Sequence, residues 1–152
     1  MTIWHHLDMN HLNYTIASKL LVSSYPNEVA GMIKLLIVDD QPSVRTGLHM
    51  RLAAEPDFAV VGEAADGEAA LDLARTLSPD VVLMDVEMPH MDGIAATDAL
   101  HKIYPSMAVI MLSIYDDAQT RARAEKAGAR AFVPKSVPTD MLLATIRQAV
   151  AR

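Results

Sequence analysis

The stretch LLIVDDQP, residues 35–42, places four apolar residues directly before two aspartates and then a proline. A continuous apolar run of this kind is typical of a strand that is buried on both faces of a parallel sheet. Pro42 stands where the first turn of a helix would begin, a position at which proline is well tolerated. The stretch therefore predicts a buried strand, two carboxylates at its end, and then a helix.

The same alternation continues to the end of the chain. Between the apolar runs, apolar residues recur at the spacing of helices with one buried stripe, as at Ala70, Leu73, Ala74 and Leu77. These units predict an α/β fold, a doubly wound, five-stranded parallel sheet with helices on both faces. The predicted strands lie at residues 35–38, 59–61, 81–84, 108–112 and 131–133.

Composition limits the classes of protein to which the chain can belong. Of its 152 residues 51% are hydrophobic, which is enough for the core of one ordinary domain. The net charge of −6 and the lack of a long basic cluster argue against direct binding of nucleic acid by this chain. There is no cysteine, so disulfides and thiolate metal sites are excluded. No apolar stretch approaches the roughly 18 residues needed to span a membrane, and we expect a soluble, cytoplasmic protein.

The pattern changes at Met32. Residues 1–31 mix histidine, asparagine, serine and tyrosine without a sustained period, and we expect them to form a poorly ordered extension before a domain at residues 32–152. A second reading is that translation naturally begins at Met32 and that residues 1–31 are additional sequence. The sequence alone does not separate these two readings.

Three aspartates follow predicted strands, Asp39 and Asp40 after the first and Asp85 after the third. In open α/β sheets, ligands bind at the carboxyl ends of the strands. If these two strands are neighbours, as in the order 2-1-3-4-5, the three carboxylates converge. Each pair at about 4 Å would then repel by about 4 kcal/mol at an effective dielectric constant near 20. Mg²⁺, which prefers oxygen ligands, would offset that repulsion. The alternative is a set of ordinary helix caps and loop acids.

Two further polar residues follow predicted strands, Ser113 after residues 108–112 and Lys135 shortly after residues 131–133. A hydroxyl can donate a hydrogen bond to a phosphoryl oxygen, and a lysine ammonium can reach the same oxygens as a point charge. Either residue alone would be an ordinary loop residue. Together with the acids, they describe a carboxylate nucleophile between a metal and a cation, an arrangement that suits phosphoryl transfer.

Four separated blocks, in this order, resemble the signature blocks of response-regulator receiver domains: IVDD at residues 37–40, VLMDVEMPHMDG at 82–93, MLS at 111–113 and GARAFVPK at 128–135. The resemblance runs from about Met32 to the C-terminus and implies a flavodoxin-like receiver fold. It implies that Asp85 is the phosphoacceptor. It also implies that Asp39, Asp40, Asp85 and the backbone carbonyl of Glu87 bind Mg²⁺.

The resemblance also implies how the signal passes on. Ser113 and Lys135 would contact the phosphoryl group, and Ser113 and Phe132 would act as the switch residues. A histidine kinase or phosphotransfer protein would be the donor. The receiver would not be an enzyme for external substrates, since it takes a phosphoryl group from donors and loses it again. The surface formed by the fourth helix (about residues 117–127), the fifth strand and the fifth helix would engage a downstream partner, an output domain or a second copy.

Residues 112–117, LSIYDD, are similar to receivers that are usually joined to a helix-turn-helix DNA-binding domain. The chain stops at Arg152, where the fifth helix should end, so we expect either a stand-alone receiver or a fragment of a longer transcriptional regulator. One departure concerns Lys135, which many receivers follow with proline. Here Pro134 precedes it and Ser136 follows, which leaves a cis peptide in doubt.

Two alternative functions remain open. A phosphatase that forms an aspartyl-phosphate usually carries a second aspartate two residues after its nucleophile, and Glu87 occupies that place here. A degenerate receiver that never takes up phosphate would have lost one of the residues named above, and all of them are present.

Overall fold

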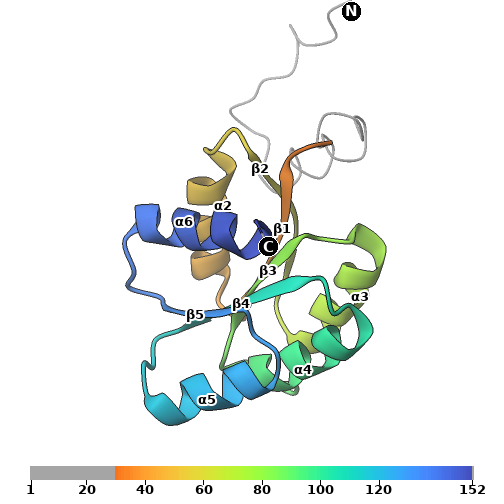
Figure 1. Cartoon of the computed structure of the whole chain (residues 1–152), viewed down its shortest axis with the longest axis vertical. Coiled ribbons are helices and arrows are strands. Elements are labelled where there is room, and N and C mark those ends of the chain that lie inside the picture. Colours follow the sequence, from red (N-terminus) through yellow and green to blue (C-terminus); the bar gives the residue numbers. More distant parts are fainter. Residues whose placement is uncertain (1–29, 152) are drawn as a thin grey trace, which may run out of the picture.

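Five parallel strands form one sheet in the computed structural model, which describes residues 30–151 (Figure 1). Their spatial order is β2-β1-β3-β4-β5, which confirms the predicted order. Since β1 pairs with both β2 and β3, the first and third strands end side by side at one edge of the sheet. The strands are β1 (Ile33–Val38), β2 (Phe58–Ala64), β3 (Val81–Asp85), β4 (Ala108–Ser113) and β5 (Ala131–Pro134).

A helix follows each strand, and three of the helices begin at an aspartate cap. The side chains of Asp66, Asp92 and Asp117 each accept a hydrogen bond of 2.8 Å from the backbone N–H three residues later. A cap of this kind contributes about 1 kcal/mol. Pro42 is the first residue of its helix, as predicted. The helices are α2 (Pro42–Ala53), α3 (Gly67–Leu77), α4 (Gly93–Ile103), α5 (Ala118–Lys126) and α6 (Thr139–Val150).

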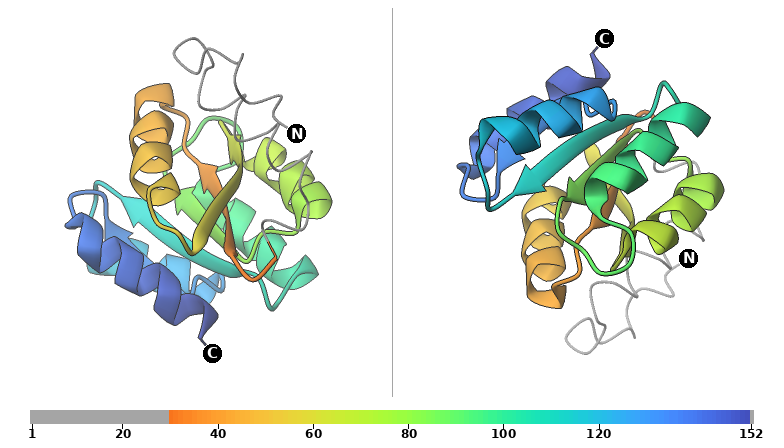
Figure 2. Two further views of the ribbon diagram at one scale, coloured as in Figure 1. Left: turned by 90° about the horizontal axis from the view of Figure 1, so that it is seen from above. Right: turned by 90° about the horizontal axis from the view of Figure 1, so that it is seen from below.

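The helices cover the two faces of the sheet unequally. Figures 1 and 2 show α2 and α6 on one side and α3, α4 and α5 on the other. Leu48, Leu52 and Ile146 pack from the first pair of helices onto one face. Leu100 packs from α4 onto the other face, where α5 contributes only Ala124 as a buried helical residue. The α5 helix is therefore held by less buried apolar surface than its neighbours.

β2 is longer than the predicted strand at residues 59–61 and runs from Phe58 to Ala64. Gly62 and Glu63 interrupt the apolar run, and this is why the pattern ended the strand too early. Glu63 is tolerated in the strand because its carboxylate pairs with His49 and Arg45 of α2.

The expectation that residues 1–31 form a poorly ordered extension falls almost wholly outside the described residues, which begin at Ala30. Within residues 30–151, no helix combines the length and the apolar character needed to cross a membrane. The peptide bonds of the same residues, including those beside Lys135, are all trans.

Candidate functional site

The ends of β1 and β3 bring three carboxylates together. One oxygen each from Asp39, Asp40 and Asp85 lies within 4.8 Å of the others. The parallel pairing of the two strands, with Val38 opposite Met84, produces this convergence. Asp39 is 1% exposed and Asp85 is 6% exposed, whereas Asp40 faces the solvent. The structure thus confirms that the predicted acidic residues meet at the carboxyl edge of the sheet.

Lys135 bridges the two buried acids. Its Nζ lies 2.7 Å from Oδ2 of Asp39 and 3.2 Å from Oδ1 of Asp85. Its backbone N–H donates to the carbonyl of Ser113 at 2.8 Å, which joins the ends of β4 and β5. Burial alone would lower the pKa of Lys135, but the hydrogen bonds and charges of the two carboxylates outweigh burial and raise this pKa. The lysine therefore stays charged and offsets part of the repulsion between the acids.

Burial dominates the electrostatics of Asp85. Its removal from water, together with the negative charge of Asp39, raises the pKa of this carboxyl to about 6 from the ordinary value of 3.8. The positive charge of Lys135 works in the opposite direction without cancelling the rise. Ionising Asp85 therefore costs about 3 kcal/mol more in the folded protein than in the unfolded chain.

We expect Asp85→Asn to raise the free energy of unfolding by about 3 kcal/mol above pH 6 when no divalent cation is present. A raised pKa means that the penalty is absent below pH 3.8, grows as pH rises towards 6, and is complete above 6. Urea unfolding of both proteins in chelator at several pH values measures the difference. If the gain in the free energy of unfolding persisted unchanged at acidic pH, the raised pKa of Asp85 would not be its cause.

Asp39 is fixed at both its side chain and its backbone. Its Oδ1 accepts a hydrogen bond of 2.9 Å from the N–H of Gln41, and its carbonyl accepts one of 2.7 Å from the guanidinium of Arg45. Sequence reasoning missed Arg45, because nothing in the spacing of α2 separates it from an ordinary surface arginine. Arg45 acts by binding the backbone carbonyl of Asp39, which lies in the loop before α2.

Ser113 ends β4 and is 1% exposed. Its Oγ accepts a hydrogen bond of 2.9 Å from the N–H of Tyr115. Phe132 lies opposite Met111 in the pairing of β4 and β5, and the guanidinium carbon of Arg121 lies 4.8 Å from the centre of its ring. Both predicted switch residues thus lie on neighbouring strands, with Phe132 in contact with α5 through Arg121.

Gly93, the first residue of α4, lies against the backbone of Asp85. A Cβ placed on Gly93 would come within 1.8 Å of the Asp85 carbonyl oxygen, and the N–H of Gly93 donates to the carbonyl of Val86 at 2.8 Å. The sequence indicated a turn at residues 92–93. The structure gives a stronger reason for the glycine, namely the close approach of a helix to the chain beneath it.

A cavity of about 490 Å³ opens over the acidic cluster. It brings together predicted site residues from four strand ends, including Glu87, whereas Asp39 and Phe132 are outside its lining. Its walls are formed by Asp40, Gln41, Val44, Asp85, Glu87, Met88, Pro89, Ser113, Ile114, Tyr115 and Lys135.

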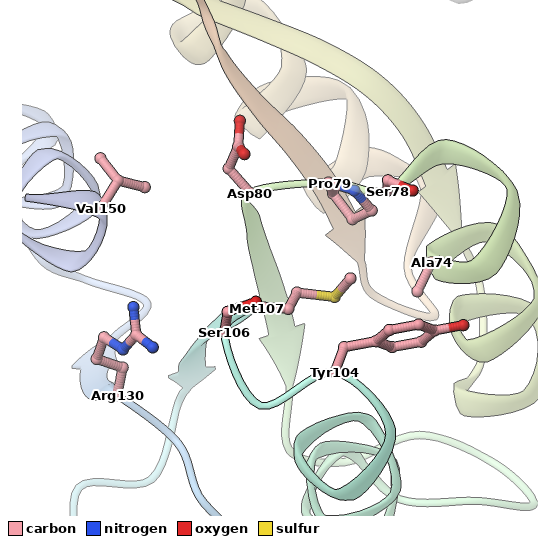
Figure 3. A pocket seen from close by; sticks show the side chains of 9 residues that line it. All are labelled: Ala74, Ser78, Pro79, Asp80, Tyr104, Ser106, Met107, Arg130 and Val150. Carbon is pink, nitrogen blue, oxygen red and sulfur yellow. The ribbon is translucent and has the colours of Figure 1, made fainter. Parts of the chain in front are cut away.

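Another pocket, of about 360 Å³, lies at the amino ends of the strands and therefore at the opposite edge of the sheet (Figure 3). Asp80 and Arg130, its charged residues, are already engaged. A carboxylate oxygen of Asp80 accepts the N–H of Lys34 at 2.8 Å, and Arg130 donates to the carbonyl of Ala149 at 2.7 Å. These contacts tie the strands and α6 together, so the acidic cavity is the better candidate for chemistry.

Known proteins are similar to this chain in fold and in sequence. A family model for the response regulator receiver domain matches residues 35–147. The response regulator GacA of Pseudomonas aeruginosa is 41% identical over 120 residues, which cover 79% of this chain and 56% of that protein. The transcriptional regulatory protein DegU of Brevibacillus brevis is 38% identical over 115 residues, covering 76% of this chain and 49% of DegU.

Among solved structures, the response regulator domain of Thermotoga maritima CheB is similar with a TM-score of 0.74 and 36% identity, covering 80% of this chain and 98% of that one. The chain spans about half the length of the curated relatives GacA and DegU.

Proposed function

The chain belongs to the response regulator receiver domains of two-component systems, and we propose that it switches when Asp85 accepts a phosphoryl group. The observation that carries the proposal is the arrangement around Asp85. This buried carboxylate opens onto a cavity, lies 3.2 Å from the ammonium of Lys135, and shares the sheet edge with two further acids.

The donor is a phosphohistidine of a histidine kinase or of a phosphotransfer protein. An oxygen of Asp85 forms a bond to phosphorus while the bond from phosphorus to the donor nitrogen breaks, and the imidazole leaves with the electron pair. Because its pKa is about 6, Asp85 is largely ionised and nucleophilic at neutral pH. Lys135 and the hydroxyl of Ser113 hold the phosphoryl oxygens, since Ser113 is the last residue of β4 and Lys135 directly follows β5 at this edge.

The residues at the site fit Mg²⁺. Three carboxylates have oxygens within 4.8 Å of one another. Mg²⁺ is a hard cation that prefers such anionic oxygen ligands. Asp39, Asp40, Asp85 and the backbone carbonyl of Glu87 would hold it. Bound Mg²⁺ would neutralise the charge on the phosphoryl oxygens during transfer.

Mg²⁺ should stabilise the wild-type protein, and Asp40→Ala should abolish that gain. Binding to the native state alone contributes about 2.7 kcal/mol at a hundredfold excess over Kd. Asp40 is exposed, so its removal leaves the core intact. Thermal unfolding with and without Mg²⁺ measures the effect. Glu87→Ala is the matched control, because it removes a carboxylate beside the cavity but keeps the backbone carbonyl. A full Mg²⁺ response in Asp40→Ala would place the ion elsewhere.

Phosphorylation would alter the surface formed by α5, β5 and α6. Ser113 is drawn towards the new oxygens. The backbone at Tyr115, whose N–H donates a hydrogen bond to the Ser113 hydroxyl, moves with it. The space behind Ser113 is then available to the ring of Phe132 on the neighbouring strand. Since α5 buries only Ala124, it moves at little cost. This surface would contact a downstream partner, an output domain or a second copy of the chain.

The domain that carries this site and this surface comprises, we propose, residues 32–152.

The proposal is tested by locating the phosphoryl group. Wild-type protein is incubated with acetyl phosphate and Mg²⁺, the acyl phosphate is reduced with borohydride, and the modified residue is found by peptide mass spectrometry. We expect a single modification, at Asp85, that chelator prevents. A modification located on Asp40, or no uptake with Mg²⁺ present, would overturn the proposal.

A further inference from the structure

Arg45 connects the acidic site to the interior of the domain. It lies in the first turn of α2, and its side chain is 19% exposed. One guanidinium nitrogen donates to the carbonyl of Asp39 at 2.7 Å, while Nε lies 3.6 Å from Oε1 of Glu63. A planar guanidinium suits this task, because it can face a carbonyl and a carboxylate at once.

Glu63 is itself held in place. It lies near the end of β2 opposite Ile37 of β1, and its side chain is 14% exposed. Its second oxygen lies 3.2 Å from Nδ1 of His49, whose side chain is 6% exposed. A continuous polar chain therefore runs from His49 through Glu63 and Arg45 to the backbone of Asp39. Partly buried charges of this kind are stable only in good geometry, so these three side chains have little freedom to shift.

The carbonyl that Arg45 binds belongs to the peptide between Asp39 and Asp40. Fixing a carbonyl fixes the plane of its peptide, because the peptide group is rigid. Asp39 is anchored through Gln41 and Lys135 as well. Asp40 is exposed, and the direction of its carboxylate depends on the backbone that carries it.

We propose that Arg45 is a positioning residue, which orients the Asp39–Asp40 peptide so that Asp40 points into the cavity and binds the cation. The inference rests on the proposed function, since it concerns the same site. Arg45 acts through the backbone and touches neither the cation nor the phosphoryl group. Glu63 and His49 serve by holding the guanidinium in place.

Simple electrostatics predicts the opposite sign. Arg45 is a positive charge close to a cation site, so its removal should tighten Mg²⁺ binding. If Arg45 positions Asp40, its removal should weaken binding instead. Residues that orient metal ligands change affinity by about 10- to 100-fold when they are replaced. The direction of the change therefore separates the two roles.

The experiment is a calorimetric titration of the full chain with Mg²⁺. We expect Arg45→Met to weaken Mg²⁺ binding about tenfold. Arg45→Lys keeps the charge but cannot face both partners, so it should weaken binding as well. Arg51→Met is the matched control on the same helix, because the Arg51 guanidinium reaches Thr139 instead of the acidic cluster. This control should bind Mg²⁺ like the wild type.

Unchanged or tighter Mg²⁺ binding in Arg45→Met would overturn the inference. Amide NMR shifts of Asp40 and Gln41 in metal-free protein provide an independent readout, and we expect them to move in both Arg45 variants. If Arg45→Met does not fold, Arg45→Lys decides the matter by the same two measurements. Failure of the proposed function looks different, because wild-type protein would then take up no phosphoryl group at Asp85, whatever Arg45→Met does to Mg²⁺ binding.

Discussion

Asp85→Asn protein will take up no phosphoryl group from acetyl phosphate in the presence of Mg²⁺, whereas the wild type will gain the mass of one. Asparagine has nearly the same shape as aspartate, but its amide carries no charge and is a poor nucleophile. We do not expect the other two acids to substitute. Asp39 is bound to Lys135 and to the N–H of Gln41, and Asp40 lies on the exposed side of the cluster. Intact-mass spectrometry of both proteins measures the difference.

We do not expect unfolding to cause the loss of uptake in Asp85→Asn. The same substitution is expected to stabilise the domain at neutral pH, since it removes a buried carboxylate whose pKa is raised to about 6. Asp98→Asn is a suitable control, because Asp98 pairs with Lys102 on the surface of α4 and lies outside the lining of the acidic cavity. It should be phosphorylated like the wild type. Uptake by Asp85→Asn equal to that of the wild type would refute the assignment of Asp85.

The sheet was predictable because its strands are buried on both faces. Continuous apolar runs marked β3 and β4 to within one residue, whereas β1 begins at Ile33, two residues before the predicted strand. The prediction ended β2 too early because Glu63 is a charged residue in a strand. Its tolerance there depends on His49 and Arg45 of a helix that precedes it in the chain. An apolar pattern contains no information about such a pairing.

The members of the candidate site were predictable for a related reason. Parallel strands end at one edge, so the residues that follow the apolar runs must converge there. This rule placed Asp85, Ser113 and Lys135 beside the two acids that follow β1. It did not reveal that Lys135 bridges Asp39 and Asp85, or that Arg45 binds the Asp39 backbone. Those contacts depend on side-chain direction and on the register between elements, which the order of residues does not specify.

The close approach of Gly93 to Asp85 leads to the second large effect. Gly93→Ala should destabilise the domain by at least about 3 kcal/mol. A Cβ at Gly93 would lie 1.8 Å from the Asp85 carbonyl oxygen and 2.8 Å from its carbonyl carbon. These are backbone atoms of a fully buried strand and cannot rotate away, so α4 or the end of β3 must shift. Overpacking against movable side chains already costs about 1 to 3 kcal/mol.

Helix propensity alone predicts the opposite result for Gly93→Ala, because alanine is favoured over glycine in helices by about 1 kcal/mol. Gly47→Ala separates the two effects. Gly47 lies within α2, and a Cβ there would meet nothing within 4 Å. We therefore expect Gly47→Ala to stabilise the domain by about 0.4 to 1 kcal/mol. Urea unfolding of the two variants beside the wild type measures both changes. If Gly93→Ala is as stable as Gly47→Ala, then the start of α4 does not press on the chain at Asp85.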